Sequence, residues 1–247
     1  MPIRITLVPP SIKHGIATLD NPSASLREHL ARLKVLRGAP KDPALEARVT
    51  QVRGWQADRL ARTYADLSAD ARYAPATRFF LDDLYGTKDY SGRDADMQRV
   101  LPVMTRVLPA SAIETAALAI EVDALSEELD RGMARSLERG EITPERYAKA
   151  YRITGTRAQR AHQIELIDQV GRRLDALVKR PLVYRMLHMM RRPARMAGLG
   201  DLQGFLERGF ESFEHMGGAD HFLATIAKRE TAIMEKIFSG QPAFSSP

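Results

Sequence analysis

The sequence of 247 residues contains no cysteine. This absence excludes structural disulfides, thiolate-ligated zinc, iron–sulfur clusters and thiol catalysis. Aromatic residues are also scarce, at 6% of the chain with one tryptophan. No apolar run reaches the ~18 residues that span a bilayer, and the first residues lack the apolar core of a signal peptide. The sequence therefore predicts a cytoplasmic protein with no transmembrane segment.

Several motifs that carry catalysis or nucleotide binding are missing as well. The chain has no Gly-x-Ser-x-Gly, no phosphate loop and no Gly-x-Gly-x-x-Gly. His162 and Glu165, like Glu211 and His215, stand at helical spacing, but the Glu-x-x-His pairs of di-iron bundles do not occur. We therefore predict no metal site and no cofactor.

What the chain does have is helical periodicity over most of its length. Apolar residues recur every three or four positions, and prolines, glycines and capping residues divide these runs. We expect helices over about 22–37, from Pro43 through Leu67, from Pro75 to Gly86, over about 95–107 and 111–138, briefly from Thr143, and over about 156–179, 201–216 and 220–238. The predicted fold is all-α: a single-domain bundle of about eight helices. It comprises an extended N-terminal arm (1–18), a helical domain (19–239) and a flexible tail (240–247).

The positive charge of the chain is concentrated in one segment. The net charge is +6, and residues 176–200 contain six Lys or Arg and no Asp or Glu. Arg185, His188, Arg192 and Arg195 form one helical stripe if Pro193 bends the helix without ending it, although residue 192 tends to leave the α region. We predict a partly exposed basic surface at 179–195, with the methionines of the segment packed inward (Met186, Met189 and Met190).

Several ligands suit such a surface. Arginine forks bind carboxylate or phosphate oxygens, so an acidic protein or an anionic small molecule is the favoured partner. Nucleic acid has less support, because the stripe is short and Tyr184 is its only aromatic residue. An anionic membrane surface, a homo-oligomer and a simple core helix with a solvated arginine face all stay open.

A second set of polar residues lies on the apolar faces of the two longest predicted helices. Glu114 and Glu121 fall in the seam between two apolar stripes of the 111–138 helix, and Arg160 and Gln163 lie within the apolar arc of the 156–179 helix. A buried carboxylate needs a cation or several donors, so we expect Glu121 to pair with Arg160 or Gln163. Such a cluster either fixes helix register or lines a polar pocket.

These two sets of residues support two functions. The first is a non-enzymatic protein that binds through the basic surface. The alternative is a helical-bundle enzyme or cofactor-binding protein, of the haem-oxygenase-like or ferritin-like oxidase class, with a pocket around Glu121 and Arg160. The missing Glu-x-x-His pairs favour the first.

Three strings of the sequence resemble a known group of proteins. They are FFLDDLYG at 79–86, RDAD at 93–96 and GLGDLQGFLERGF at 198–210. Together they are similar to an uncharacterised family of helical proteobacterial proteins with an FFLxDLYG-type motif, over about residues 20–239. The resemblance implies a bacterial origin and an all-helical fold, and it implies no activity.

Overall fold

The structure of the protein is a computed structural model that describes residues 21–38, 42–84, 96, 99–100, 108–137 and 140–244. All regular structure in these residues is helical, which confirms the predicted all-α fold. Eight of the α-helices have nine residues or more, as the periodicity predicts. The N-terminal arm expected at 1–18 and most of the helix expected at 95–107 lie outside the described residues.

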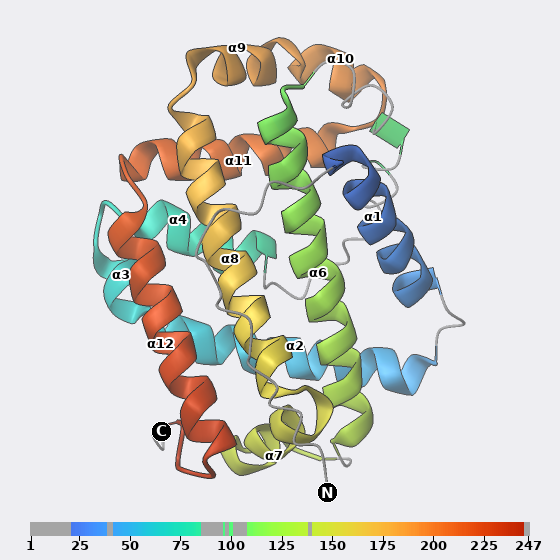
Figure 1. The fold of residues 1–247 in the computed structure, drawn as a ribbon, viewed down its shortest axis with the longest axis vertical. Helices are drawn as coiled ribbons and strands as arrows, with labels where there is room; N and C mark the ends of the chain where they lie inside the picture. The colour runs from blue at the N-terminus through green and yellow to red at the C-terminus, as the bar shows by residue number, and fades with distance from the viewer. Residues whose placement is uncertain are drawn as a thin grey trace, which may run out of the picture.

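Three long helices run side by side through the molecule (Figure 1). Of these, α8 lies in the middle, between α6 and α12, and α1 covers the opposite side of α6. A further long helix, α2, crosses α6, and the short α7 lies near one end of α6 (Figure 1). The bounds of these helices are α1 Pro22–Gly38, α2 Pro43–Thr63, α6 Ala110–Ser136, α7 Pro144–Thr154, α8 Arg157–Val178 and α12 Asp220–Phe238.

The remaining elements are shorter or lie across this group. Helix α11 packs on α4 and α8, while α9 and α10 pack on α11. The π-helix η1 follows α4 without a break. The bounds are α3 Ala65–Ala69, α4 Ala74–Phe79, η1 Phe80–Leu84, α9 Pro181–Met189, α10 Arg191–Met196 and α11 Gly200–Met216.

The central position of α6 follows from its two apolar stripes. The stripe that includes Ile113 and Ile120 packs against Leu26, Leu30 and Leu33 of α1. The second stripe, with Leu118, Leu125 and Leu129, packs against Leu166 of α8. Because each stripe buries against a different neighbour, α6 is covered on two sides.

Local signals in the sequence set several helix starts. Asp42 accepts a hydrogen bond from the Ala44 amide at 3.0 Å, and Pro43 occupies the first turn of α2. Thr156 and Gln159 form a reciprocal capping box at the start of α8. At the end of α11, Gly217 adopts a left-handed conformation with φ 65°.

The described part of the first string, residues 79–84, lies against the 198–210 string in the fold. Asp83 of η1 is buried and accepts two hydrogen bonds from Arg208 of α11, at 2.6 and 3.1 Å. The rings of Phe79 and Phe205 are 5.3 Å apart. A Cβ at Gly209 would lie 2.9 Å from the Phe79 ring, so only glycine allows this approach. The residues that carry the resemblance therefore join η1 to α11.

Residues 240–244 belong to the segment predicted to be a flexible tail. Within it, Phe244 makes edge contacts with the rings of Trp55 and Tyr147, at centroid distances of 5.2 and 5.7 Å. The contact joins the end of the described chain to α2 and α7, while flexibility in the segment stays a prediction.

Candidate functional site

The basic segment forms a cap of two short helices at one end of the molecule (Figure 1). We call residues 181–196, which comprise α9 and α10, the α9–α10 cap. Its inner side is apolar: Val183 and Leu187 pack against the cluster that contains Phe210, and Ala194 is buried. The cap therefore has a fixed inner face on α11 and an outer face toward solvent.

Polar contacts from α11 hold the cap in place. The Gln203 amide donates to the Leu187 carbonyl at 2.8 Å and to the Glu207 carboxylate at 2.7 Å. Arg191 donates to the same carboxylate at 2.6 Å. Burial opposes ionisation of Glu207, but the hydrogen bonds from Arg191 and Gln203 outweigh it and lower the pKa of Glu207. Arg191 therefore belongs to the attachment of the cap.

Three arginines of the cap take no part in this attachment. Arg185, Arg192 and Arg195 are exposed, and none of them makes a hydrogen bond or ion pair with the described part of the chain. The neighbouring Lys179 differs, because it pairs with Asp175 at 2.5 Å. The outer face of the cap thus carries arginine charge that no ion pair from the described residues neutralises.

His188, the fourth residue predicted for this surface, has a different setting. It is partly buried, and its ring centroid lies 4.1 Å from that of Tyr184. Its Nδ1 lies 3.1 Å from the Tyr184 carbonyl oxygen. His188 is therefore held along α9, beside the exposed arginines.

The single helical stripe is expected only if one helix continues through Pro193, and this condition is not met. The helix is interrupted at Met190, after the end of α9, and Pro193 lies in the first turn of α10. Proline is tolerated there because the amides of a first turn have no partner within the helix. Arg192 keeps a helical conformation, contrary to the expectation for a residue before proline.

The predicted inward packing of the cap methionines is wrong for two of the three. Met189 is 77% exposed and Met190 47% exposed, whereas Met186 is partly buried. Met196 and Leu182 are also exposed, at 89% and 67%. Because α9 has only nine residues, Val183 and Leu187 already fill its inner face, and the outer apolar residues have nothing in the described chain to pack against.

The predicted partner of Glu121 is also wrong. Glu121 is partly buried and lies between two histidines: His162 Nε2 at 3.1 Å and His29 Nε2 at 3.6 Å. These side chains come from α6, α8 and α1, so the carboxylate links three helices. Within the described ranges, no group of three or more His, Asp or Glu residues has an arrangement that could hold a metal ion.

The other members of the predicted polar cluster have separate partners. Gln163 donates to Ser126 at 2.7 Å, and Glu114 pairs with Arg173. Arg160 is 2% exposed, and its guanidinium lies 3.8 Å above the Tyr151 ring. Its Nε and Nη2 make no hydrogen bond with the described residues. Among the described residues, Arg160 makes no hydrogen bond or ion pair with Glu121, because its contact with the Tyr151 ring directs the guanidinium toward α7.

A buried ionic network that the sequence reasoning missed lies lower on α6. Glu127 is 2% exposed and pairs with Arg37 at 2.9 Å, Arg53 at 2.7 Å and Arg131 at 2.6 Å. Burial opposes ionisation of Glu127, but Arg53 and Arg37 outweigh it and lower its pKa to about 2. For Asp130, burial is the stronger effect and raises the pKa, although Arg53 opposes it.

A signal for this network is present in the sequence. Glu127 and Arg131 continue the stripe of Ile120 and Ala124 at spacings of three and four, so they face α1 and α2 as those residues do. The network therefore joins α1, α2 and α6 and is structural.

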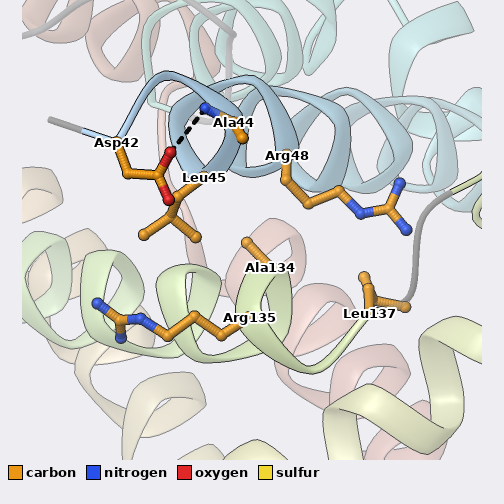
Figure 2. Close-up of a pocket in the computed structure, with 7 residues that line it drawn as sticks. All are labelled: Asp42, Ala44, Leu45, Arg48, Ala134, Arg135 and Leu137. Atoms are coloured by element: carbon orange, nitrogen blue, oxygen red, sulfur yellow. Dashed lines mark hydrogen bonds between the residues drawn. The ribbon is translucent and has the colours of Figure 1, made fainter.

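Two shallow grooves mark the surface of the described residues. The larger, of about 340 Å³, lies between the start of α2 and the end of α6. Figure 2 shows Arg48 and Arg135 extended in opposite directions beside the apolar Leu45, Ala134 and Leu137. The second, of about 270 Å³, lies near α4. Neither groove is lined by a residue of the α9–α10 cap, by Glu121 or by Arg160.

Comparison with known families gives a match over most of the chain. The family model described as Domain of unknown function (DUF8198) matches residues 36–244, most of the chain. The chain belongs to the DUF8198 family. This confirms the resemblance to an uncharacterised family, while the motif as a family signature and the proteobacterial origin stay predictions. Comparison of this DUF8198 chain with curated proteins and with solved structures gives no match.

The helices of the DUF8198 chain also bear on its relation to membranes. In the ranges that the structure describes, none of them combines the length and apolar character needed to cross a bilayer.

Proposed function

We propose that this protein is a non-enzymatic binding protein whose α9–α10 cap docks an acidic, amphipathic helical segment of a partner protein. One observation carries the proposal: exposed arginines that form no ion pair with the described residues lie on the same two helices as exposed methionines. Both features are on the outer face, while Arg191 and the apolar inner residues attach the cap to α11.

The charge of the cap supports an acidic partner. Residues 176–200 contain six Lys or Arg and no Asp or Glu. Of these, Arg185, Arg192 and Arg195 are exposed and unpaired within the described chain. The planar guanidinium binds a carboxylate through two parallel hydrogen bonds, so Glu and Asp side chains are suitable counterparts.

The apolar part of the cap supports a protein helix as the docked segment. Met189, Met196 and Leu182 are each more than half exposed. Methionine has a flexible, polarisable side chain that adapts to apolar partners, and Met and Arg are both enriched in protein interfaces. An amphipathic helix with an acidic face beside an apolar one matches both parts of this surface.

Other ligands fit the cap less well. Nucleic acid binding commonly uses exposed aromatic rings for stacking, and Tyr184, the one aromatic residue of the cap, is only 38% exposed. Membrane-surface helices combine Lys and Arg with Trp, Phe and Leu; the cap shares the arginines and one exposed leucine, but it has no Trp or Phe, and its other highly exposed apolar residues are methionines. A second copy of this chain, docked cap to cap, would bring arginines of like charge together.

The enzyme alternative depends on Glu121 and Arg160 sharing one site. Glu121 lies between two histidines and Arg160 stacks on Tyr151, so the two side chains do not act on a common ligand in this arrangement. We therefore do not propose it.

The test is direct binding of the full chain to fluorescent synthetic peptides, measured by anisotropy. The panel contains helices of about 20 residues, about 30 Å long, with Glu along one face and Leu beside it. Scrambled peptides of the same composition, duplex DNA, heparin and anionic lipid vesicles are measured in parallel. We expect binding of the amphipathic acidic peptides that weakens as salt rises, because exposed charges are screened over about 8–10 Å.

Two variants with equal loss of charge locate the site. R185Q/R192Q/R195Q removes the outer arginines of the cap, and R62Q/R78Q/R135Q removes three exposed arginines on other helices. We expect the first variant to bind at least about tenfold more weakly and the second to bind as the wild type does. A wild type that binds none of the peptides, or that prefers DNA or vesicles, contradicts the proposal.

A further inference from the structure

The described methionines differ widely in exposure, with Met186 partly buried between the two extremes. Met133, Met216 and Met234 are buried, at 0%, 1% and 3% exposure. The exposed methionines of the described chain are Met189, Met190 and Met196, at 77%, 47% and 89%, and all three lie in the α9–α10 cap. Since the chain has no cysteine, these thioethers are the most accessible sulfur atoms of the described residues.

We propose that Met189, Met190 and Met196 are a site of reversible oxidation by hydroperoxides, and that their conversion to sulfoxides releases the docked partner. The effect on binding rests on the proposed function. The assignment of the oxidised residues rests on exposure alone.

The reaction is a two-electron oxidation of each thioether by hydrogen peroxide. The methionine sulfur attacks one peroxide oxygen, an S–O bond forms as the O–O bond breaks, and sulfur is oxidised while the peroxide is reduced. The second oxygen leaves as water after proton transfer, so one peroxide gives one sulfoxide and one water. Methionine sulfoxide reductases reverse the reaction, one enzyme for each sulfoxide epimer.

The location of these residues explains why oxidation affects docking and leaves the fold intact. Their side chains project from the outer face of the cap, so a sulfoxide oxygen there remains hydrated in the free protein. In the docked complex the same oxygen would be buried against apolar side chains without a hydrogen-bond donor, which is unfavourable. Met133, Met216 and Met234 pack in the core, where oxidation would disrupt folding, but their burial protects them.

The experiment treats the full chain with limiting hydrogen peroxide and follows each methionine by peptide mass spectrometry. We expect sulfoxide at the three cap positions before the three core positions, with an unchanged melting temperature. Affinity for the acidic amphipathic peptide should fall at least about tenfold. Treatment with both sulfoxide reductases and a thiol reductant should restore it.

The control is M189L/M190L/M196L, which keeps apolar side chains of similar volume without sulfur. It should bind the peptide as the wild type does and keep that affinity after peroxide. If peroxide lowers the affinity of this variant as much as that of the wild type, the proposed switch is wrong. It is also wrong if the wild type still binds the peptide with all three sulfoxides present. If peroxide modifies the core methionines first, the assignment of the site is wrong. If the reduced wild type does not bind the peptide at all, both the docking function and the switch are wrong. The mass spectra then still show whether the three cap methionines are the residues that peroxide oxidises first.

Discussion

At the residue scale, carboxylates in this protein differ according to how far they are removed from water. Glu127 is 2% exposed and accepts hydrogen bonds from three arginines, on α1, α2 and α6 itself. The Glu121 side chain is 22% exposed and lies between two histidines. A buried charge with several cationic partners contributes to stability as long as every partner remains, and loss of one member leaves the others uncompensated.

Glu127→Gln should therefore lower the free energy of unfolding at neutral pH by about 3 kcal/mol. This is the free energy that corresponds to lowering the pKa from its ordinary value of 4.5 to about 2 in the folded protein, at about 1.4 kcal/mol per pKa unit. Because the folded pKa is the lower one, this contribution is complete above pH 4.5. It is lost as the pH falls toward 2. Urea denaturation of the wild type and the variant at several pH values measures the gap, which should be widest at pH 7 and close in acid.

Glu121→Gln is the matched control for this experiment. It removes one carboxylate from the same helix, but its partners are imidazoles that are themselves partly exposed, so we expect a loss of about 1 kcal/mol or less at pH 7. Equal losses in the two variants would show that burial does not separate the two sites.

At the element scale, α11 connects the cap to the rest of the fold. One side of α11 meets α4 and η1 through Gly209, Phe205 and Arg208, and another side holds α9 and α10 through Gln203 and Glu207. The close contact at Gly209 and the amide of Gln203 give each of these attachments a position to test.

Gly209→Ala should destabilise the protein by about 1–2 kcal/mol. The new Cβ would lie 2.9 Å from the Phe79 ring, and overpacking of about 1–3 kcal/mol exceeds the gain in helix propensity. Gly54→Ala on α2 is the control: no atom lies within 4 Å of its new Cβ, so it should stabilise by about 0.5–1 kcal/mol. Thermal denaturation measures both, and a neutral Gly209→Ala would argue against the close packing of α4 on α11.

Gln203→Ala should loosen the cap. Its amide donates to the Leu187 carbonyl and to Glu207; Glu207 keeps its hydrogen bond from Arg191, whereas loss of the donor to the Leu187 carbonyl costs about 1–3 kcal/mol. Hydrogen exchange should become faster in the α9 amides and stay unchanged in α12. Gln169→Ala, which removes one exposed contact with Glu165, should leave both helices as they are. Faster exchange in α12 as well would mean that the effect is global.

The sequence predicts the elements of this fold better than their partners. Capping residues and prolines carry local signals, so the starts at Pro43, Thr143 and Thr156 agree with the structure. The break at Met190 has no such signal, because Pro193 fits the first turn of a new helix. The partner of Glu121 depends on how α1, α6 and α8 are rotated against one another, and periodicity within single helices does not contain that information.

At the scale of the whole molecule, the cap is a surface built on a rigid support. The long helices α6, α8 and α12 run alongside one another, α11 packs on α8, and α9 and α10 lie on α11 at one end (Figure 1). Residues 176–200 contain six Lys or Arg and no Asp or Glu. Arg185, Arg192 and Arg195 are exposed without an ion pair in the described chain, so this end carries positive charge that can attract an acidic partner. The core and the ionic network around Glu127 lie away from the exposed arginines, so changes to the outer face should alter binding without altering the fold.

The exchange of charges across the proposed interface tests this account most directly. R185E/R192E/R195E is measured against the acidic amphipathic peptide and against the same peptide with each Glu replaced by Lys. We predict that the variant loses the acidic peptide, binds the basic one, and keeps the melting temperature of the wild type, because electrostatic complementarity selects the partner. If the variant unfolds, or if its preference for the two peptides equals that of the wild type, the arginines of the cap do not form a docking surface.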